Sequence, residues 1–267
     1  MRSNTSNVLV AFLAIVTLVS LTGYQVTSET SAVRLLGRLG GALIEIDRWL
    51  PAHRDDIELL ARDRPSQPLV LTDLPIEVSI PAPAALEASQ PVLEATITDA
   101  MGRKLYEDGY GAIHDEQGKS HLAITEPLRW AIDGLDSSAH GFWRIAVVVA
   151  GLALLVVCLA HFWARQSPLP GLAIGSAIAA VLSLAVWLAV SALGSSVSGG
   201  IDEEIAMVAR DGVWLGLRNS FAATGIGLGA LYVYNSFAGP RREEDWEEWD
   251  DFDYETPEPE SREAPPY

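Results

Sequence analysis

The sequence is short of cysteine and lysine. Cys158 is the only cysteine, and it lies inside an apolar run. One chain therefore forms neither a disulfide framework nor a cysteine-ligated metal site. Of the 18 basic residues only Lys104 and Lys119 are lysines, a bias that we interpret as typical of a GC-rich prokaryotic genome.

Basic charge is scarce as well, and the net charge of the chain is −17 at pH 7. Residues 25–144 carry 19 acidic and 11 basic side chains, whereas residues 240–267 carry 12 acidic and 3 basic ones. Binding to nucleic acid requires a basic face that neutralises phosphates. No segment supplies such a face, so we predict no nucleic-acid partner.

Charged residues are absent from three long stretches, at residues 145–163, 171–193 and 219–237. About 20 mostly apolar residues in a helix are enough to cross the hydrocarbon core of a bilayer. The third stretch is richer in small residues, but Tyr232 and Tyr234 give it an aromatic belt at one end. We predict that all three are transmembrane helices in contact with a lipid bilayer.

A further apolar stretch, residues 8–24, has two interpretations. One arginine before a short apolar core also describes a secretory signal peptide, with small residues such as Ser28 at a possible cleavage site. Against cleavage, apolar residues continue through residues 33–50 at spacings of three and four, as if one helix ran on from the membrane. We favour an uncleaved first transmembrane helix, and the cleaved form stays open.

Arginines close to the ends of these stretches predict the orientation. With four spans, Arg2, Arg165 and the pair Arg241 and Arg242 fall on one side of the membrane. Arginine in short flanking segments marks the cytoplasmic side, whereas long loops are translocated largely regardless of charge. We therefore predict a multi-pass protein of the cell membrane with both termini in the cytoplasm.

The predicted fold class is an α-helical polytopic membrane protein with four spans and an α+β extracytoplasmic domain between the first and second spans. The predicted segments run in the following order: a cytoplasmic N-terminus at 1–7, the first span at 8–24, the extracytoplasmic domain at 25–144, the second span at 145–163, a cytoplasmic loop at 164–170, the third span at 171–193, an extracytoplasmic loop with a short amphipathic helix at 194–218, the fourth span at 219–237 and a disordered acidic cytoplasmic tail at 238–267.

The predicted extracytoplasmic domain shows both helical and strand patterns. Residues 69–71 and 76–80 are typical of strands, and in the second of them Ile76, Val78 and Ile80 alternate with polar residues. A helix is predicted over residues 91–107, with apolar residues on one face and a glycine after its end. These patterns are the basis for the α+β prediction.

Small residues recur at intervals of four in the third and fourth predicted spans. In lipid, this spacing lets two helix backbones approach closely. The candidate packing residues are Gly171, Gly175, Ala223, Gly225, Gly227 and Gly229. They indicate either packing between the third and fourth spans of one chain or assembly into an oligomer or a larger membrane complex.

The sequence matches no catalytic template that we tested. The densest polar cluster is Glu107, Asp108, His114, Asp115 and Glu116, with a further histidine nearby at 121. Its spacing fits neither a zinc-binding helix nor a nucleophile elbow nor a phosphate-binding loop. We interpret the cluster as a solvated turn, and we predict no cofactor, no metal site and no catalytic residues.

The segment from Pro240 onward is acidic and rich in proline at its end, a composition typical of disorder. Aromatic residues are nevertheless interleaved with the acids, at Trp246, Trp249, Phe252 and Tyr254. The first three recur at intervals of three, so a helix that forms on binding would place them along one side. We predict a protein partner for this tail; the alternative is an acidic solubilising tail whose aromatic residues rest at the membrane surface.

The leading functional hypothesis is a non-enzymatic membrane adaptor, sensor or scaffold that links an extracytoplasmic domain to a cytoplasmic partner through the tail. The second is an accessory subunit of a membrane transport or envelope-assembly complex. A membrane hydrolase with a site built from dispersed residues is the third.

Overall fold

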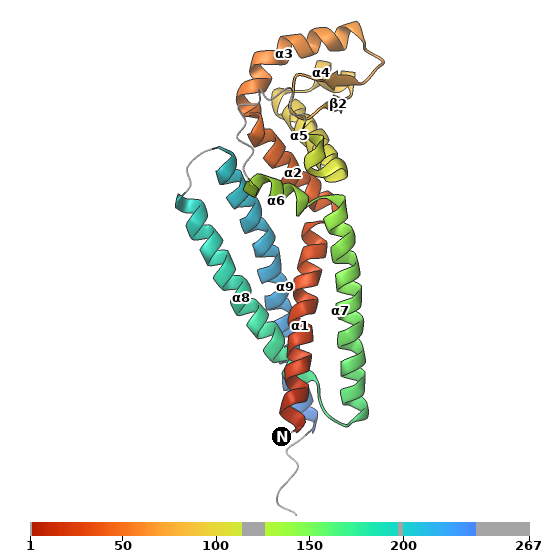
Figure 1. The fold of residues 1–267 in the computed structure, drawn as a ribbon, viewed down its shortest axis with the longest axis vertical. Coiled ribbons are helices and arrows are strands. Elements are labelled where there is room, and N and C mark those ends of the chain that lie inside the picture. The colour runs from red at the N-terminus through yellow and green to blue at the C-terminus, as the bar shows by residue number, and fades with distance from the viewer. Residues whose placement is uncertain (1, 114–125, 197–199, 239–267) are drawn as a thin grey trace, which may run out of the picture.

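The computed structural model describes residues 2–113, 126–196 and 200–238, and side chains from residue 6 onward (Figure 1). This part of the chain is mostly helical. Its elements are α1 (Arg2–Val26), α2 (Glu29–Leu43), α3 (Ile46–Asp63), β1 (Leu69–Leu71), β2 (Val78–Ile80), α4 (Ala82–Glu87), α5 (Gln90–Asp108), the 3₁₀ helix η1 (Gly109–Ala112), α6 (Glu126–Asp133), α7 (Ser137–Trp163), α8 (Leu169–Ser196) and α9 (Ile201–Ala238).

Four long helices, α1, α7, α8 and α9, form what we call the stem (Figure 1). Three of its helical segments are long and apolar enough to cross a membrane: Ser6–Val26, Ser137–Trp163 and Leu169–Ser196, with mean hydropathies of 2.0, 2.8 and 2.3. They coincide with the predicted first, second and third spans. The chain therefore has the character of a helical, multi-pass membrane protein whose apolar helices suit a lipid bilayer.

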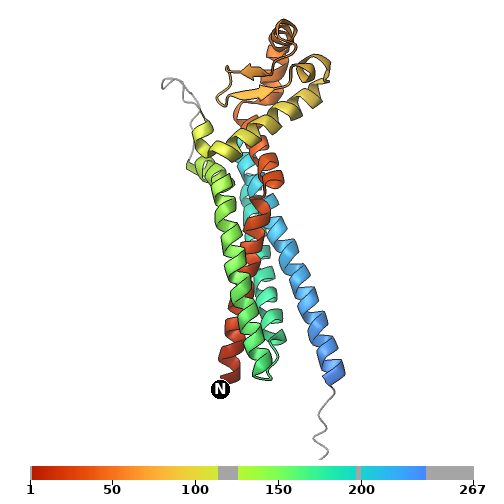
Figure 2. The same cartoon turned by 90° about the vertical axis from the view of Figure 1, so that its right-hand side faces the viewer.

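The predicted fourth span forms the C-terminal half of α9, which is 38 residues long. Glycines, tyrosines and Asn219 make this half less apolar than the other spans, and α9 is not one of the three helices that qualify. A fourth span therefore stays a prediction. Figure 2 shows α9 diverging from α1 and α7 toward its C-terminal end.

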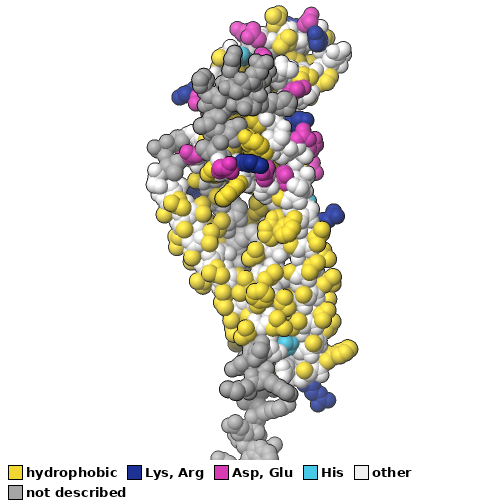
Figure 3. All heavy atoms as spheres, in the orientation of Figure 1, with side chains coloured by type: hydrophobic (Ala, Val, Ile, Leu, Met, Phe, Trp, Pro, Cys, Tyr) yellow, Lys and Arg dark blue, Asp and Glu magenta, His cyan; other side chains and the backbone are white. Residues whose placement is uncertain are grey.

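The start of α1, the turn between α7 and α8, and the end of α9 all lie at one end of the stem (Figure 1). The remaining elements, in residues 27–113 and 126–136, lie at the opposite end and form what we call the head. Space-filling colours separate the two parts. Apolar side chains cover the stem, whereas acidic and basic side chains are concentrated on the head and at its junction with the stem (Figure 3).

The head is built on two crossing helices, α2 and α5. Strands β1 and β2 pair antiparallel, with Val70 opposite Ser79, and an isolated bridge joins Ile76 to Ile113. The largest fully buried side chains of the head come from α2, α3, α5, α6 and the segment of the small sheet: Leu36, Leu39, Leu50, Ile76, Ile80, Leu93, Ile97, Met101, Leu105, Leu128 and Ile132. Burial of the alternating residues in β2 and of one face of α5 confirms those two sequence patterns.

Strand content in the described residues of the head is limited to this sheet and the isolated bridge. The predicted α+β class of the domain is therefore not established. The hairpin strand pattern is present, but helices supply most of the described structure.

Glycine permits the close crossing of α2 and α5. A Cβ atom on Gly37 would lie 2.5 Å from the carbonyl oxygen of Thr98, and one on Gly102 would lie 2.1 Å from that of Val33. Real Cβ atoms do not make contacts this short, so both positions require glycine, which has no Cβ atom. At the end of α5, Gly109 adopts φ 59° and ψ −147°, a conformation that is essentially restricted to glycine.

Two helix boundaries differ from the sequence pattern. Residues 33–50 do not continue the first span as one helix. The helix is interrupted between α1 and α2 and again at Glu45, whose φ is 49°. The apolar face nevertheless stays buried, with Val33, Leu36 and Leu39 all inside. Residues 201–218, predicted to hold a separate amphipathic helix, are instead continuous with residues 219–238 in α9.

Candidate functional site

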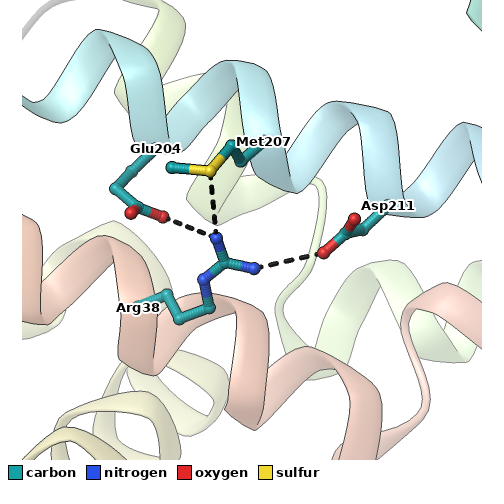
Figure 4. Close-up of polar contacts among 4 residues, drawn as sticks. All are labelled: Arg38, Glu204, Met207 and Asp211. Carbon is teal, nitrogen blue, oxygen red and sulfur yellow. Dashed lines mark hydrogen bonds and ion pairs between the residues drawn. The ribbon is translucent and has the colours of Figure 1, made fainter. Parts of the chain in front are cut away.

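One arginine of the head contacts three residues of a stem helix. The Arg38 guanidinium on α2 donates from Nη1 to Asp211 Oδ2 at 3.1 Å and from Nη2 to Glu204 Oε2 at 3.0 Å. Its Nη2 also lies 3.5 Å from Met207 Sδ. Figure 4 shows the guanidinium between the three side chains, which all project from α9. We call these four residues the Arg38 cluster.

Helical spacing explains how the cluster forms. Glu204, Met207 and Asp211 are three and four residues apart, so they share one face of α9. The planar guanidinium has several fixed N–H donors and can engage two carboxylates at once. The side chain of Arg38 is 37% exposed, so water screens these ion pairs in part. The cluster links α2 of the head to the first part of α9.

A second polar contact lies just below, between α1 and α9. Asn219 Nδ2 donates to Gln25 Oε1 at 2.7 Å and to Thr22 Oγ1 at 3.3 Å. At the same level, His140 on α7 stacks on Tyr24, with ring centroids 4.9 Å apart. Three stem helices are thus held together by polar and aromatic groups at the end next to the head.

A polar cleft of about 740 Å³ lies between α2, α5 and the start of α9. Its walls carry both signs of charge: Arg34, Arg48, Glu94, Asp99 and Glu203 line it together with Arg38. The described residues contain no group of three or more histidine, cysteine, aspartate or glutamate side chains that could hold a metal ion. The full lining holds six acidic side chains and three arginines, so the cleft has an acidic surplus.

The polar cluster singled out in the sequence is only partly described. Lys104 Nζ donates a hydrogen bond to Asp108 Oδ2 at 2.6 Å, and the two side chains form an ion pair. This hydrogen bond raises the pKa of Lys104 above its ordinary value, because the carboxylate favours the charged ammonium. The two side chains form an ordinary pair along α5. His114, Asp115, Glu116 and His121 lie outside the described residues.

The candidate glycines of α8 contact the first helix. A Cβ atom on Gly171 would lie 2.8 Å from the carbonyl oxygen of Asn7, and one on Gly175 would lie 2.5 Å from that of Ala11. Both positions therefore bring the backbones of α8 and α1 together.

The candidate small residues of α9 lie in two environments. A Cβ atom on Gly227 would be 3.4 Å from Ala173 Cα on α8, which is ordinary packing, and Ala223 is half-buried. Gly225 and Gly229 are exposed. Apart from the adjacent residues and the backbone of α9 itself, no atom in the described part of the chain lies within 4 Å of a Cβ placed on either glycine. The tail residues Trp246, Trp249, Phe252 and Tyr254 lie outside the described residues.

Sequence reasoning did not single out the Arg38 cluster or the Gly37–Gly102 crossing. Two signals were present: Glu204 and Asp211 stand seven residues apart, and Arg38 lies between glycines in a short amphipathic segment. Neither signal identifies the partner of Arg38, because its contacts join segments more than 160 residues apart.

Comparison of the chain with protein-family models, curated proteins and solved structures gives no significant match. The functional argument therefore depends on the geometry of this chain alone.

Proposed function

We propose that the protein is a non-enzymatic membrane adaptor, sensor or scaffold, whose head meets an extracytoplasmic partner and whose acidic tail recruits a cytoplasmic protein. Helix α9 is the observation that carries this proposal. It begins in the Arg38 cluster at the head and ends where the acidic tail begins. Its 38 residues give a length of about 57 Å at 1.5 Å per residue, more than the ~30 Å of bilayer hydrocarbon.

The sidedness in this proposal comes from the arginines. Arg165, in the turn between α7 and α8, belongs to the end of the stem that also holds the start of α1 and the end of α9 (Figure 1). Arg2 and the pair Arg241 and Arg242 flank the same end in sequence. Arginines in short flanks favour the cytoplasmic side, so this end is cytoplasmic in our proposal and the head lies outside the cell membrane.

The tail supplies the partner-binding element in the proposal. Its acidic surplus disfavours both a folded core and contact with anionic lipid. Trp246, Trp249 and Phe252 would occupy an apolar groove with a basic rim on a cytoplasmic protein. Because α9 is one uninterrupted helix, a displacement of the head would reach the start of this segment.

The test compares three variants with the intact protein, each purified from membranes in mild detergent. One is truncated after Gly239, and one carries Trp246→Ala, Trp249→Ala and Phe252→Ala, which preserve length and charge. The matched control carries Glu258→Gln, Glu260→Gln and Glu263→Gln, beyond the aromatic residues. Co-purifying proteins are identified by mass spectrometry, and size-exclusion chromatography checks the fold of each variant.

We expect one cytoplasmic protein to be lost with the truncation and with the aromatic substitutions, and to be retained by the glutamine control. Retention of every partner by the truncated chain would contradict the adaptor proposal. Loss in all three variants would assign the effect to charge and would contradict a role for the aromatic residues.

A second candidate function is supported by the exposed face of α9. Gly225 and Gly229 leave backbone open on the surface of a helix that would lie in lipid, which suits close approach by a helix of another subunit. As an accessory subunit of a transport or envelope-assembly complex, the protein would lose its complex on Gly225→Leu plus Gly229→Leu. The matched change Gly151→Leu, on α7, also meets open space and should leave the complex intact.

A further inference from the structure

An apolar groove opens in the side of the stem just below the head. Helices α1 and α8 touch backbone to backbone at Gly171 and Gly175 and then diverge toward the head, as Figure 1 shows. The space above the contact begins at Ala179 and has a volume of about 620 Å³. Val19 on α1, together with Leu182 and Val186 on α8, are among the exposed apolar side chains of its walls.

The back wall of the groove is made of small residues. Ala209, Gly212, Gly216 and Ser220 follow one another at spacings of three and four on α9, so they share one face of that helix. The larger α9 residues in the lining are Ile205, Val208 and Val213. The volume lies within the range of about 300–1,000 Å³ that is typical of small-molecule sites.

Two of the four hydroxyl groups in the wall, those of Thr22 and Thr27, donate to backbone carbonyls of their own helix. Thr22 Oγ1 donates to the carbonyl oxygen of Leu18 at 2.9 Å, and Thr27 Oγ1 donates to that of Gly23 at 2.8 Å. These threonines therefore present their methyl groups to the groove. An apolar space of this kind does not hold ordered water, because water needs polar partners.

Helix α6 closes the end of the groove next to the head. It lies across the top of the stem in Figure 1 and has two apolar sides. Leu128 and Ile132 are buried in the head core, whereas Trp130, Ala131 and Gly134 line the groove. Trp130 is 74% exposed, and tryptophan is enriched at membrane–water boundaries. The groove thus starts at the level of an interfacial helix and extends down among the apolar helices.

We propose that this groove binds one acyl chain of a membrane phospholipid. A transmembrane helix from a partner would have to continue past the end of the stem, where α6 lies in its path. An acyl chain ends inside its own leaflet and needs no exit, and a bilayer presents such chains directly at the open side. Two neighbouring stem helices would then be bridged by lipid. This proposal is independent of the tail and of the proposed adaptor function.

The test uses the full-length protein, reconstituted in vesicles of phosphatidylethanolamine and phosphatidylglycerol and then analysed by native mass spectrometry. Ser183→Phe and Ala209→Phe fill the groove from positions that line it and are not buried. Ala185→Phe and Ala222→Phe add the same bulk at exposed positions of α8 and α9 outside the groove. Size-exclusion profiles of all four variants must match that of the wild type.

We expect the wild type and both controls to retain one phospholipid per chain, and the filled variants to retain it about tenfold less often, which equals about 1.4 kcal/mol of binding free energy. Equal retention in filled and control variants would overturn the proposal. So would a stoichiometric polypeptide that is lost only from the filled variants, because a partner segment would then occupy the groove.

A measurement on the unchanged protein keeps the proposal testable if the variants fold poorly. The protein is loaded with phosphatidylcholine that carries a photoreactive acyl chain, diluted into unlabelled vesicles and irradiated. Label on Val19 and Leu182 should persist after dilution, whereas label on Phe221 and Ile226, which are exposed on α9 outside the groove, should fall. Equal loss at both places would show ordinary exchange with bulk lipid and would overturn the proposal.

Discussion

The head and the stem bury opposite kinds of side chain. The fully buried large residues of the head are leucine, isoleucine and methionine, and they interlock in one core. In α8 the buried residues are Gly171, Ala173, Gly175, Ser176, Ala179 and Ala180, whereas most of its leucines, valines and isoleucines are exposed.

The solvent explains this difference. In water, burying apolar area is the main driving force, so large apolar side chains move inside. In lipid there is no such force between helices, because acyl chains are as apolar as leucine, and small residues gain more by close backbone packing. The crossing of α2 and α5 in the head combines both modes: Gly37 and Gly102 bring the backbones together within a core of large side chains.

Gly102→Ala should have the largest effect on the head. Its new Cβ atom would lie 2.1 Å from the carbonyl oxygen of Val33 and 2.9 Å from the amide nitrogen of Gly37. Both are backbone atoms, so the helices must separate, and we expect a loss of about 4 kcal/mol or more in the stability of the head. Pulse proteolysis of membrane vesicles in increasing urea measures this loss.

Gly111→Ala is the matched control for that change, because among the described residues, apart from its neighbours in the chain and the backbone of its own short helix, no atom lies within 4 Å of a Cβ on Gly111. It should leave the urea midpoint close to that of the wild type. A similar shift in both variants would mean that general loss of glycine flexibility, rather than the crossing of α2 and α5, determines stability.

Replacing one leucine in each part sharpens the comparison directly. Leu36 in the head is 0% exposed, and Leu155 on α7 is 54% exposed. Leu36→Ala should destabilise the head by about 3 kcal/mol, through lost burial and a new cavity. Leu155→Ala exchanges a side chain for lipid and should cost under about 0.5 kcal/mol. Thermal unfolding in vesicles compares them, and equal losses would argue against a lipid-facing Leu155.

A smaller effect is expected at the glycine contact within the stem. Gly175→Ala places a Cβ atom 2.5 Å from the carbonyl oxygen of Ala11. The Cβ atom of Gly229→Ala has no neighbour from another helix within 4 Å among the described residues. Because α8 can shift as a rigid helix in lipid, we expect a loss of about 2 kcal/mol for the first change. Unfolding in increasing dodecyl sulfate measures it. An equal loss for Gly229→Ala would place a partner helix on the exposed face.

Local patterns in the sequence predicted those elements that have either one buried face in the head or an apolar surface along the stem. The alternation of Ile76, Val78 and Ile80 predicted the second strand, and the apolar stretches at 8–24, 145–163 and 171–193 coincide with the three helices that are long and apolar enough to span a membrane. The continuity of residues 201–238 could not be predicted in this way. Its first half follows an amphipathic pattern and its second half a membrane pattern. The change of pattern predicts a boundary, but the structure has one continuous helix, whose first half packs against α2 and α6.

Pairings across the chain were equally hidden. Arg38 lies in a segment whose pattern predicts a buried face, but its partners Glu204 and Asp211 are fixed only when α9 packs beside α2. The glycine spacing in α8 indicated a close helix contact and left its partner open. The structure places Gly171 and Gly175 against α1.

Arg38→Gln tests whether the two parts are coupled, and its expected effect on stability is smaller than that of Gly102→Ala, Leu36→Ala or Gly175→Ala. The pairs with Glu204 and Asp211 are partly exposed, at 37% for the arginine side chain, so we expect a loss of about 1 kcal/mol. The main readout is hydrogen exchange. Amide exchange at the start of α9 and in the middle of α2 should become faster, because the two helices lose their shared contact.

Arg103→Gln is the control for Arg38→Gln. Arg103 pairs with Asp99 at 2.9 Å, and both residues belong to α5, so the loss of this pair should leave exchange in α9 unchanged. A double-mutant cycle of Arg38→Gln with Glu204→Gln should also show coupling that weakens as salt rises, since the pair is partly open to solvent. Unchanged exchange in Arg38→Gln would mean that apolar contacts such as that of Val208, which is buried in the head core, hold the head and stem together without the ion pairs.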